Sequence, residues 1–121
     1  MPRKYKVMTG LTYRAERALR GCIRGKWEPL ASGKFDKPRE AWCDCCTLLG
    51  CDKCPIAERA GMGGCKNTPY IVWCSSLRGQ VYWPYTVDYN IPTTVAFAKK
   101  ELRFLKDTLR LGLAARERNR K

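Results

Sequence analysis

Cysteines are the residues with the clearest chemistry in this chain, which has eight of them and no histidine. Two Cys-x-x-Cys pairs stand close together, Cys43 with Cys46 and Cys51 with Cys54, and Cys65 follows in a glycine-rich region. A tight turn brings the sulfurs of such a pair to one side, and zinc takes four thiolates in a tetrahedron. We therefore expect four of these five cysteines to hold one structural zinc ion.

The choice of ligands stays open, because the short gap between the two pairs would give a cramped loop if both bound one ion. Cys65 can replace one member of these pairs. The spacing Cys46-x4-Cys51-x2-Cys54 also matches a plant-type [2Fe–2S] loop, so an iron–sulfur cluster is the alternative cofactor. Reduced thiols in a core are a further alternative. So is a secreted disulfide scaffold, which is disfavoured because the N-terminus has no apolar signal core.

The residue types argue against an enzyme. Without histidine the chain has no Ser-His-Asp or Cys-His nucleophile system and no imidazole metal ligand. A shell of four thiolates leaves zinc no open position for water. The carboxylates beside the cysteines, Asp44, Asp52 and Glu58, do not form a convincing acid–base pair. We therefore expect no catalytic residues.

The charge of the chain indicates a polyanionic partner. It has 24 Lys and Arg against 11 Asp and Glu, a net charge of +13, and the excess lies in residues 1–41 and 93–121. Cations that bind phosphates release counterions, which drives association with DNA or RNA. The candidate nucleic-acid-binding residues form two bands with helical spacing: Arg14, Arg17, Arg20 and Arg24, then Lys99, Lys100, Arg103, Lys106 and Arg110.

The N-terminal part is expected to hold a short strand and one helix. Residues 4–8 suit a strand, and Thr12 suits the N-cap of a helix that runs to about Arg20 and stops at Gly21. Residues 25–41 contain two glycines and two prolines and are interpreted as a loop.

A β-hairpin is expected after the cysteine-rich region. Residues 71–74 and 80–85 are rich in Val, Tyr and Trp, which fit a half-buried pleat, and residues 75–79 suit the turn between them. This hairpin makes the predicted fold class α+β. The expected fold is a small domain centred on a zinc knuckle, with an N-terminal helix, the short hairpin and a long C-terminal amphipathic helix.

The C-terminal helix has the clearest pattern. Thr93 or Thr94 can cap it, Pro92 precedes it, and Gly112 follows its expected end at about Leu111. Its apolar residues step by three and four, which predicts a buried stripe of Val95, Ala98, Leu102, Leu105 and Leu109.

Three cysteine motifs follow one another within residues 42–70: Cys-x-x-Cys, Cys-x-x-Cys-Pro, and Gly-Cys-x-x-Thr-Pro-Tyr at residues 64–70. This order resembles a pattern in small bacteriophage and prophage proteins of largely unassigned function. Those proteins typically close with a helix rich in Ala, Lys and Leu, as this chain is expected to do. The resemblance implies a phage origin and a metal-knuckle fold, and it implies no particular activity.

Together these features predict a zinc-stabilised basic nucleic-acid-binding protein, a phage-encoded regulator or accessory factor. The alternative is a phage anti-defence or host-takeover protein that binds a host protein or a ribonucleoprotein complex. No apolar run is long enough to span a membrane, and we expect the protein in the host cytoplasm. The expected parts are 1–41 (basic segment), 42–70 (metal centre), 71–115 (hairpin and helix) and 116–121 (frayed basic tail). The kind of nucleic acid and the oligomeric state stay open.

Overall fold

The computed structural model describes residues 5–34, 49, 54–61, 68–80 and 88–120, and the regular elements in these ranges are helices. In chain order they are α1 (Tyr13–Cys22), the π-helix η1 (Ile23–Trp27), α2 (Glu28–Ser32), α4 (Pro55–Ala60), α5 (Tyr70–Arg78) and α6 (Pro92–Asn119). The predicted α+β class is therefore wrong for the described part of the chain, which contains no strand.

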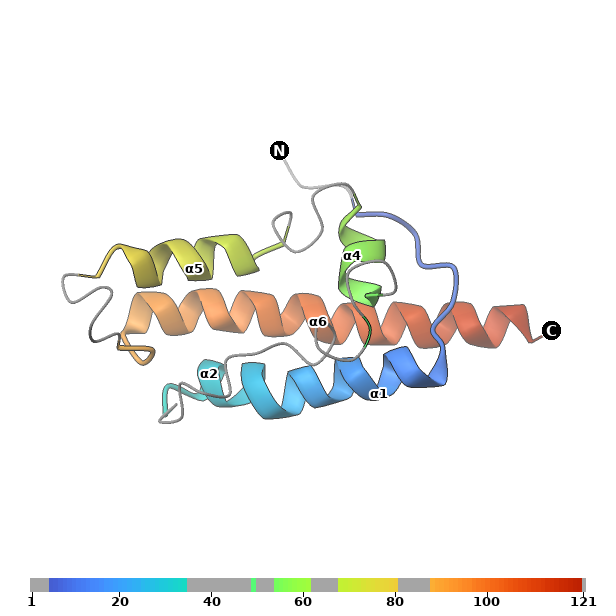
Figure 1. The fold of residues 1–121 in the computed structure, drawn as a ribbon, viewed down its shortest axis with the longest axis horizontal. Helices are drawn as coiled ribbons and strands as arrows, with labels where there is room; N and C mark the ends of the chain where they lie inside the picture. Colours follow the sequence, from blue (N-terminus) through green and yellow to red (C-terminus); the bar gives the residue numbers. More distant parts are fainter. Residues whose placement is uncertain (1–4, 35–48, 50–53, 62–67, 81–87, 121) are drawn as a thin grey trace.

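The long helix α6 is the centre of the fold (Figure 1). Helices α1 and α2 run along one side of it in the opposite direction, whereas α5 and α4 lie on the other side, against its N-terminal half and its middle. Nη2 of Arg116 near the end of α6 contacts Oε1 of Glu16 in α1 at 2.7 Å. At the other end, the Oγ of Ser76 in α5 lies 3.1 Å from the Oγ1 of Thr94.

The core lies between α6 and the helices on both sides. Its largest fully buried apolar side chains are Trp27, Leu19, Leu30, Ile56 and Leu105. Burying a Leu or Ile side chain stabilises a fold by about 1.5–3 kcal/mol, so these contacts dominate the packing. An aromatic cluster attaches α5 to η1, because the rings of Trp27 and Trp73 meet edge to face with centroids 5.0 Å apart.

The first helical segment starts as predicted and continues further than predicted. The Oγ1 of Thr12 accepts a hydrogen bond from the Ala15 N–H at 3.1 Å, which confirms the N-cap. The predicted stop at Gly21 is wrong: α1 passes into η1 and α2, and the segment ends at Gly33, whose φ is 77°. Glycine inside a helix costs about 0.5–1 kcal/mol. The burial of the apolar residues 22, 23, 27, 30 and 31 outweighs that cost.

The predicted loop at 25–41 is therefore wrong for residues 25–32, whereas residues 35–41 lie outside the described ones. The π-helix has a clear consequence for packing. It places two successive side chains, Lys26 and Trp27, inside the fold. The Nζ of Lys26 lies over the rings of Trp27, Tyr70 and Trp73, at 4.9, 5.2 and 5.5 Å from their centroids.

The predicted strand at 71–74 belongs to helix α5, and the predicted turn at 75–79 is also mostly helical. Trp73 and Leu77 are buried one turn apart, and this helical period of burial decides against the strand preference of Ile, Val and Trp. Gln80 follows the helix, and the rest of the predicted second strand lies outside the described residues. Residues 5–8 form an irregular segment, tied to α4 by a hydrogen bond from the Lys6 N–H to the Arg59 carbonyl at 2.6 Å.

Helix α6 is longer at both ends than predicted. Pro92 is its first residue, and the helix passes Gly112 and includes Arg116 of the predicted frayed tail. Gly112 has a packing role, because a Cβ at this position would lie 3.1 Å from the Cβ of Leu11. Of the predicted apolar stripe, Ala98 and Leu105 are buried. In the described part of the chain, no helix combines the length and the apolar character that a membrane span requires.

Candidate nucleic-acid interface

The strongest basic feature is a stripe along α6 formed by Lys99, Arg103, Lys106 and Arg110, all of them exposed. At 100° per residue these positions fall within about 60° of one another around the helix. The stripe is about 16 Å long at 1.5 Å per residue. Lys100 is also exposed and lies beside it. We call the first four residues the α6 stripe.

The stripe faces solvent because the opposite side of α6 faces the core. The buried residues of its central part are Ala98, Glu101, Phe104, Leu105, Thr108 and Gly112. Their mean direction lies about 180° from the stripe at 100° per residue. The packing that forms the fold therefore leaves the cations of the stripe available to a partner.

A shallow hollow lies within the stripe. It has a volume of about 330 Å³ and is lined by Lys99, Leu102, Arg103, Lys106 and Asp107. Leu102 adds an apolar surface among the cations, so the hollow can contact both a phosphate and the apolar part of a sugar or base. Asp107 lies 3.7 Å from Arg110, and such an exposed pair contributes little to stability.

The α1 band is weaker than the α6 stripe. Arg14, Arg17, Arg20 and Arg24 are all exposed, as expected. However, Nε of Arg20 donates to the carboxylate of Glu16 at 2.8 Å, and Arg116 of α6 donates to the same carboxylate at 2.7 Å. Hydrogen bonds from Arg116 and then Arg20 hold the pKa of Glu16 below its ordinary value. Glu16 thus offsets part of the positive charge of the α1 band.

Of the five candidate zinc ligands, the described residues include one, Cys54. It is the N-cap of α4, with φ −78° and ψ 123°, and it is buried in the core. Cys43, Cys46, Cys51 and Cys65 lie outside the described residues. No group of three or more potential metal ligands occurs within the described ranges. The ligand set and the zinc ion therefore stay predictions.

Sequence reasoning missed Arg59, which the fold places against α6. Its guanidinium lies over the rings of Tyr5 and Phe104, at 4.9 and 4.6 Å from their centroids. Nη1 donates to the carbonyl of Phe104 and to Oγ1 of Thr108, both at 3.0 Å. Burial lowers the pKa of Arg59, and the charge of Asp107 opposes this effect. No local signal could reveal these contacts, because the partners lie about fifty residues away in the sequence.

The positions of all nine predicted cations are now defined: each is exposed, and they divide between α1 with η1 and the middle of α6. Comparison with known proteins adds no relative. No family model matches the chain, and neither a curated protein nor a solved structure matches it.

Proposed function

We propose that this protein is a zinc-stabilised, basic nucleic-acid-binding protein that contacts the phosphate backbone of DNA or RNA through the α6 stripe. The observation that carries the proposal is the placement of four exposed cations on one face of α6, opposite its buried face. The α1 arginines extend the positive surface. A phage-encoded regulator or accessory factor is the setting that the cysteine motifs imply.

The dimensions of the stripe support this proposal. Its length of about 16 Å matches roughly five base steps at 3.4 Å per step. Four cations over this distance can each reach a different phosphate of one strand. Contacts of this kind position a protein on the backbone without reading the sequence, so we propose binding with little sequence preference. The net charge of +13 favours rapid association with any such polyanion.

The proposed role of zinc is to stabilise the segment that connects α2 with α5. An all-cysteine ion has no open coordination position, so its contribution is folding free energy. Cys54 would connect the ion to the core, because it is the N-cap of α4 and α4 packs against α6. The zinc site would in this way support the helix that presents the α6 stripe.

Fluorescence anisotropy with labelled single-stranded DNA, duplex DNA and RNA tests the proposed function. Binding should weaken as the salt concentration rises. If the four stripe residues each bind a phosphate, the slope of log K against log[salt] for duplex DNA should be about −3 to −4 or steeper. The double variant R103Q/K106Q should make this slope shallower by about 2. The variant K34Q/R78Q is the matched control, because it also removes two exposed cations but lies outside the stripe and the α1 band.

Two results would overturn the proposal. One is an equal effect of the stripe variant and the control, which would indicate a non-specific response to net charge. The other is the absence of binding at low salt. If the protein binds no nucleic acid but keeps a host protein bound after nuclease treatment, the anti-defence or host-takeover alternative is supported instead.

A further inference from the structure

Tyr13, the first residue of α1, has a side chain that is open to solvent. The residue is 70% exposed, whereas the aromatic residues Trp27 and Trp73 are buried. A single exposed apolar residue is common on protein surfaces, so its surroundings decide whether it has a role.

The surroundings of Tyr13 on α1 are cationic. At 100° per residue, Arg17 and Arg20 lie within about 40° of Tyr13 around the helix. Both arginines are exposed. The opposite side of α1, about 180° away, packs on the core through Ala15, Ala18, Leu19 and Cys22. Helix α1 therefore presents one aromatic ring and two guanidinium groups on the same solvent-facing side.

The ring of Tyr13 is held by Arg116 of α6. The guanidinium lies over the ring, 4.3 Å from its centroid, and a cation in this position is attracted to the aromatic face. Arg116 is itself fixed, because it donates to the Leu11 carbonyl at 3.0 Å and to Oε1 of Glu16 at 2.7 Å. One face of the ring thus carries a cation, and the exposure of 70% leaves the other face to a ligand.

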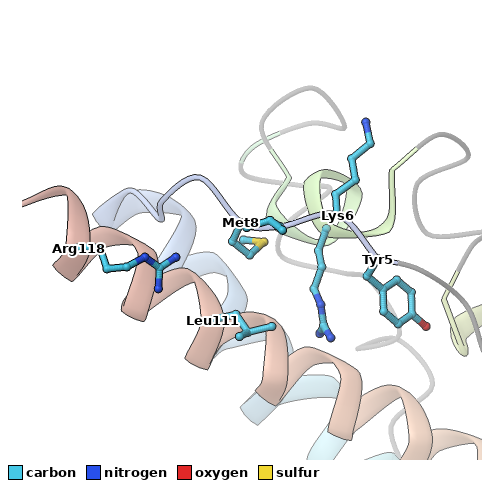
Figure 2. Close-up of a pocket in the computed structure, with 7 residues that line it drawn as sticks. Tyr5, Lys6, Met8, Leu111 and Arg118 are labelled. Atoms are coloured by element: carbon cyan, nitrogen blue, oxygen red, sulfur yellow. The ribbon is translucent and has the colours of Figure 1, made fainter.

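The segment that leads into α1 is fixed on α6 as well. Figure 2 shows Met8 of this segment across a small pocket from Leu111 of α6. Met8 is buried, and Nδ2 of Asn119 donates to the Thr9 carbonyl at 2.7 Å. These contacts fix the point at which α1 begins, so Tyr13 is in place before a ligand arrives. Preorganisation of this kind lowers the ordering cost of binding.

The distances along α1 fit a strand of stacked nucleotides. Arg17 and Arg20 lie about 6 and 10 Å from Tyr13 along the helix axis, at 1.5 Å per residue. These distances correspond to about two and three nucleotides of a stacked strand at 3.4 Å per nucleotide. A base on the ring therefore brings the phosphates of the following nucleotides within reach of the two arginines.

The two arginines differ in their partners. Nε of Arg20 lies 2.8 Å from the carboxylate of Glu16. Arg17, in contrast, makes no ion pair within the described part of the chain. A phosphate at Arg17 has no carboxylate to displace, so Arg17 is the stronger phosphate ligand of the two.

We propose that Tyr13 stacks on an unpaired base of single-stranded DNA or RNA, while Arg17 and Arg20 bind the phosphates beside it. This role rests on the proposed function and adds to it a preference for unpaired strands. In a duplex each base is already stacked and paired, so a surface ring reaches a base face only in a single strand. Every base has an aromatic face, so stacking agrees with binding that has little sequence preference.

Fluorescence anisotropy with labelled oligothymidylate, oligouridylate and a DNA duplex tests the role of Tyr13. The variant Y13L removes the ring and should weaken binding of the single strands about tenfold, as expected for the loss of one stacked base. Its affinity for the duplex should stay within about twofold of the wild type. The matched control is Y13F, which keeps the ring and should bind the single strands within about twofold of the wild type. Because Tyr13 is exposed, both variants should unfold close to the wild-type temperature.

A strand built of abasic sites separates stacking from charge. It carries the same phosphates without bases, so the wild type and Y13L should bind it equally, within about twofold. The variant R17Q should make the salt slope for oligothymidylate shallower by about 0.7. The variant K34Q, which also removes an exposed cation, should leave that slope unchanged.

Three results would overturn the stacking role. They are unchanged binding of both single strands by Y13L, an equal loss in Y13F and Y13L, and a loss in Y13L that is as large for the abasic strand or the duplex. In each case, a salt slope that R103Q/K106Q makes shallower would leave the proposed function in place. Absence of binding to every strand would refute the proposed function and the stacking role together. A Y13L effect on only one of the two intact strands would support the role and assign it to DNA or to RNA.

Discussion

Replacing Gly112 with alanine tests whether this glycine is present for packing. The new Cβ would lie 3.1 Å from the Cβ of Leu11 and 3.2 Å from its Cδ2. A Cβ cannot rotate away, so the backbone at Leu11 would have to move. That backbone is fixed, because Arg116 donates to the Leu11 carbonyl at 3.0 Å and Thr12 caps α1.

The size of the effect is the difference between two terms. Overpacking a core costs about 1–3 kcal/mol. Alanine in place of glycine inside a helix stabilises it by up to about 1 kcal/mol. We expect G112A to lower the free energy of unfolding by about 1 kcal/mol, which corresponds to a melting temperature lower by about 3–5 °C.

The control is Gly25 in the π-helix η1, where an added Cβ would meet no atom of the described residues within 4 Å beyond its own helix backbone and its two neighbours. G25A should raise the melting temperature by a few degrees, since only the helix-propensity term acts. Thermal unfolding followed by circular dichroism measures both variants under the same conditions. A G112A variant that is stabilised as much as G25A would refute the close approach of α6 to Leu11.

Two further predictions concern Glu16 and Cys54. The pKa of Glu16 is lowered in the folded state, so its stabilising contribution is present above its ordinary pKa of 4.5 and is lost as the pH falls through the lower folded value. Chemical denaturation at a series of pH values should therefore show a smaller loss of stability in acid for E16Q than for the wild type, and equal losses would contradict this. For Cys54, metal analysis should find about one zinc per chain in the colourless wild-type protein and in C22S, but less zinc and lower thermal stability in C54S. A brown wild-type protein, or full zinc content in C54S, would contradict the zinc site or the role of Cys54 in it.

Local signals in the sequence correctly located the start of α1 but not its end, and they missed both ends of α6. Thr12 caps a backbone N–H three residues away, so its role is visible in a short window. Gly21 and Gly112 match the local pattern of helix stops, but both lie inside helices. The burial of the residues that follow Gly21 favours continuing that helix, and Gly112 lies where α6 approaches the side chain of Leu11.

The hairpin prediction was wrong for a related reason. Residues 71–74 have strand-forming side chains, yet Trp73 packs on Trp27 from a segment more than forty residues earlier. That contact and the burial of Leu77 make a helix more stable than a strand for this segment. Neither the contact nor the burial is visible in the local sequence. Helical spacing did predict the exposure of the nine cations, because charged residues on one face of an amphipathic helix point away from its core. Arg59 could not be found in this way, since its partners Tyr5 and Phe104 come from both ends of the chain.

NMR mapping of an unlabelled oligonucleotide on the isotope-labelled protein tests most directly where a nucleic acid binds. Binding through the α6 stripe predicts that the largest shifts fall on the side chains of Lys99, Arg103, Lys106 and Arg110 and on the backbone between them. The exposed end of α5 at Arg78 should change little. Shifts that concentrate on α5, or that are uniform over all exposed cations, would contradict a nucleic-acid interface on α6.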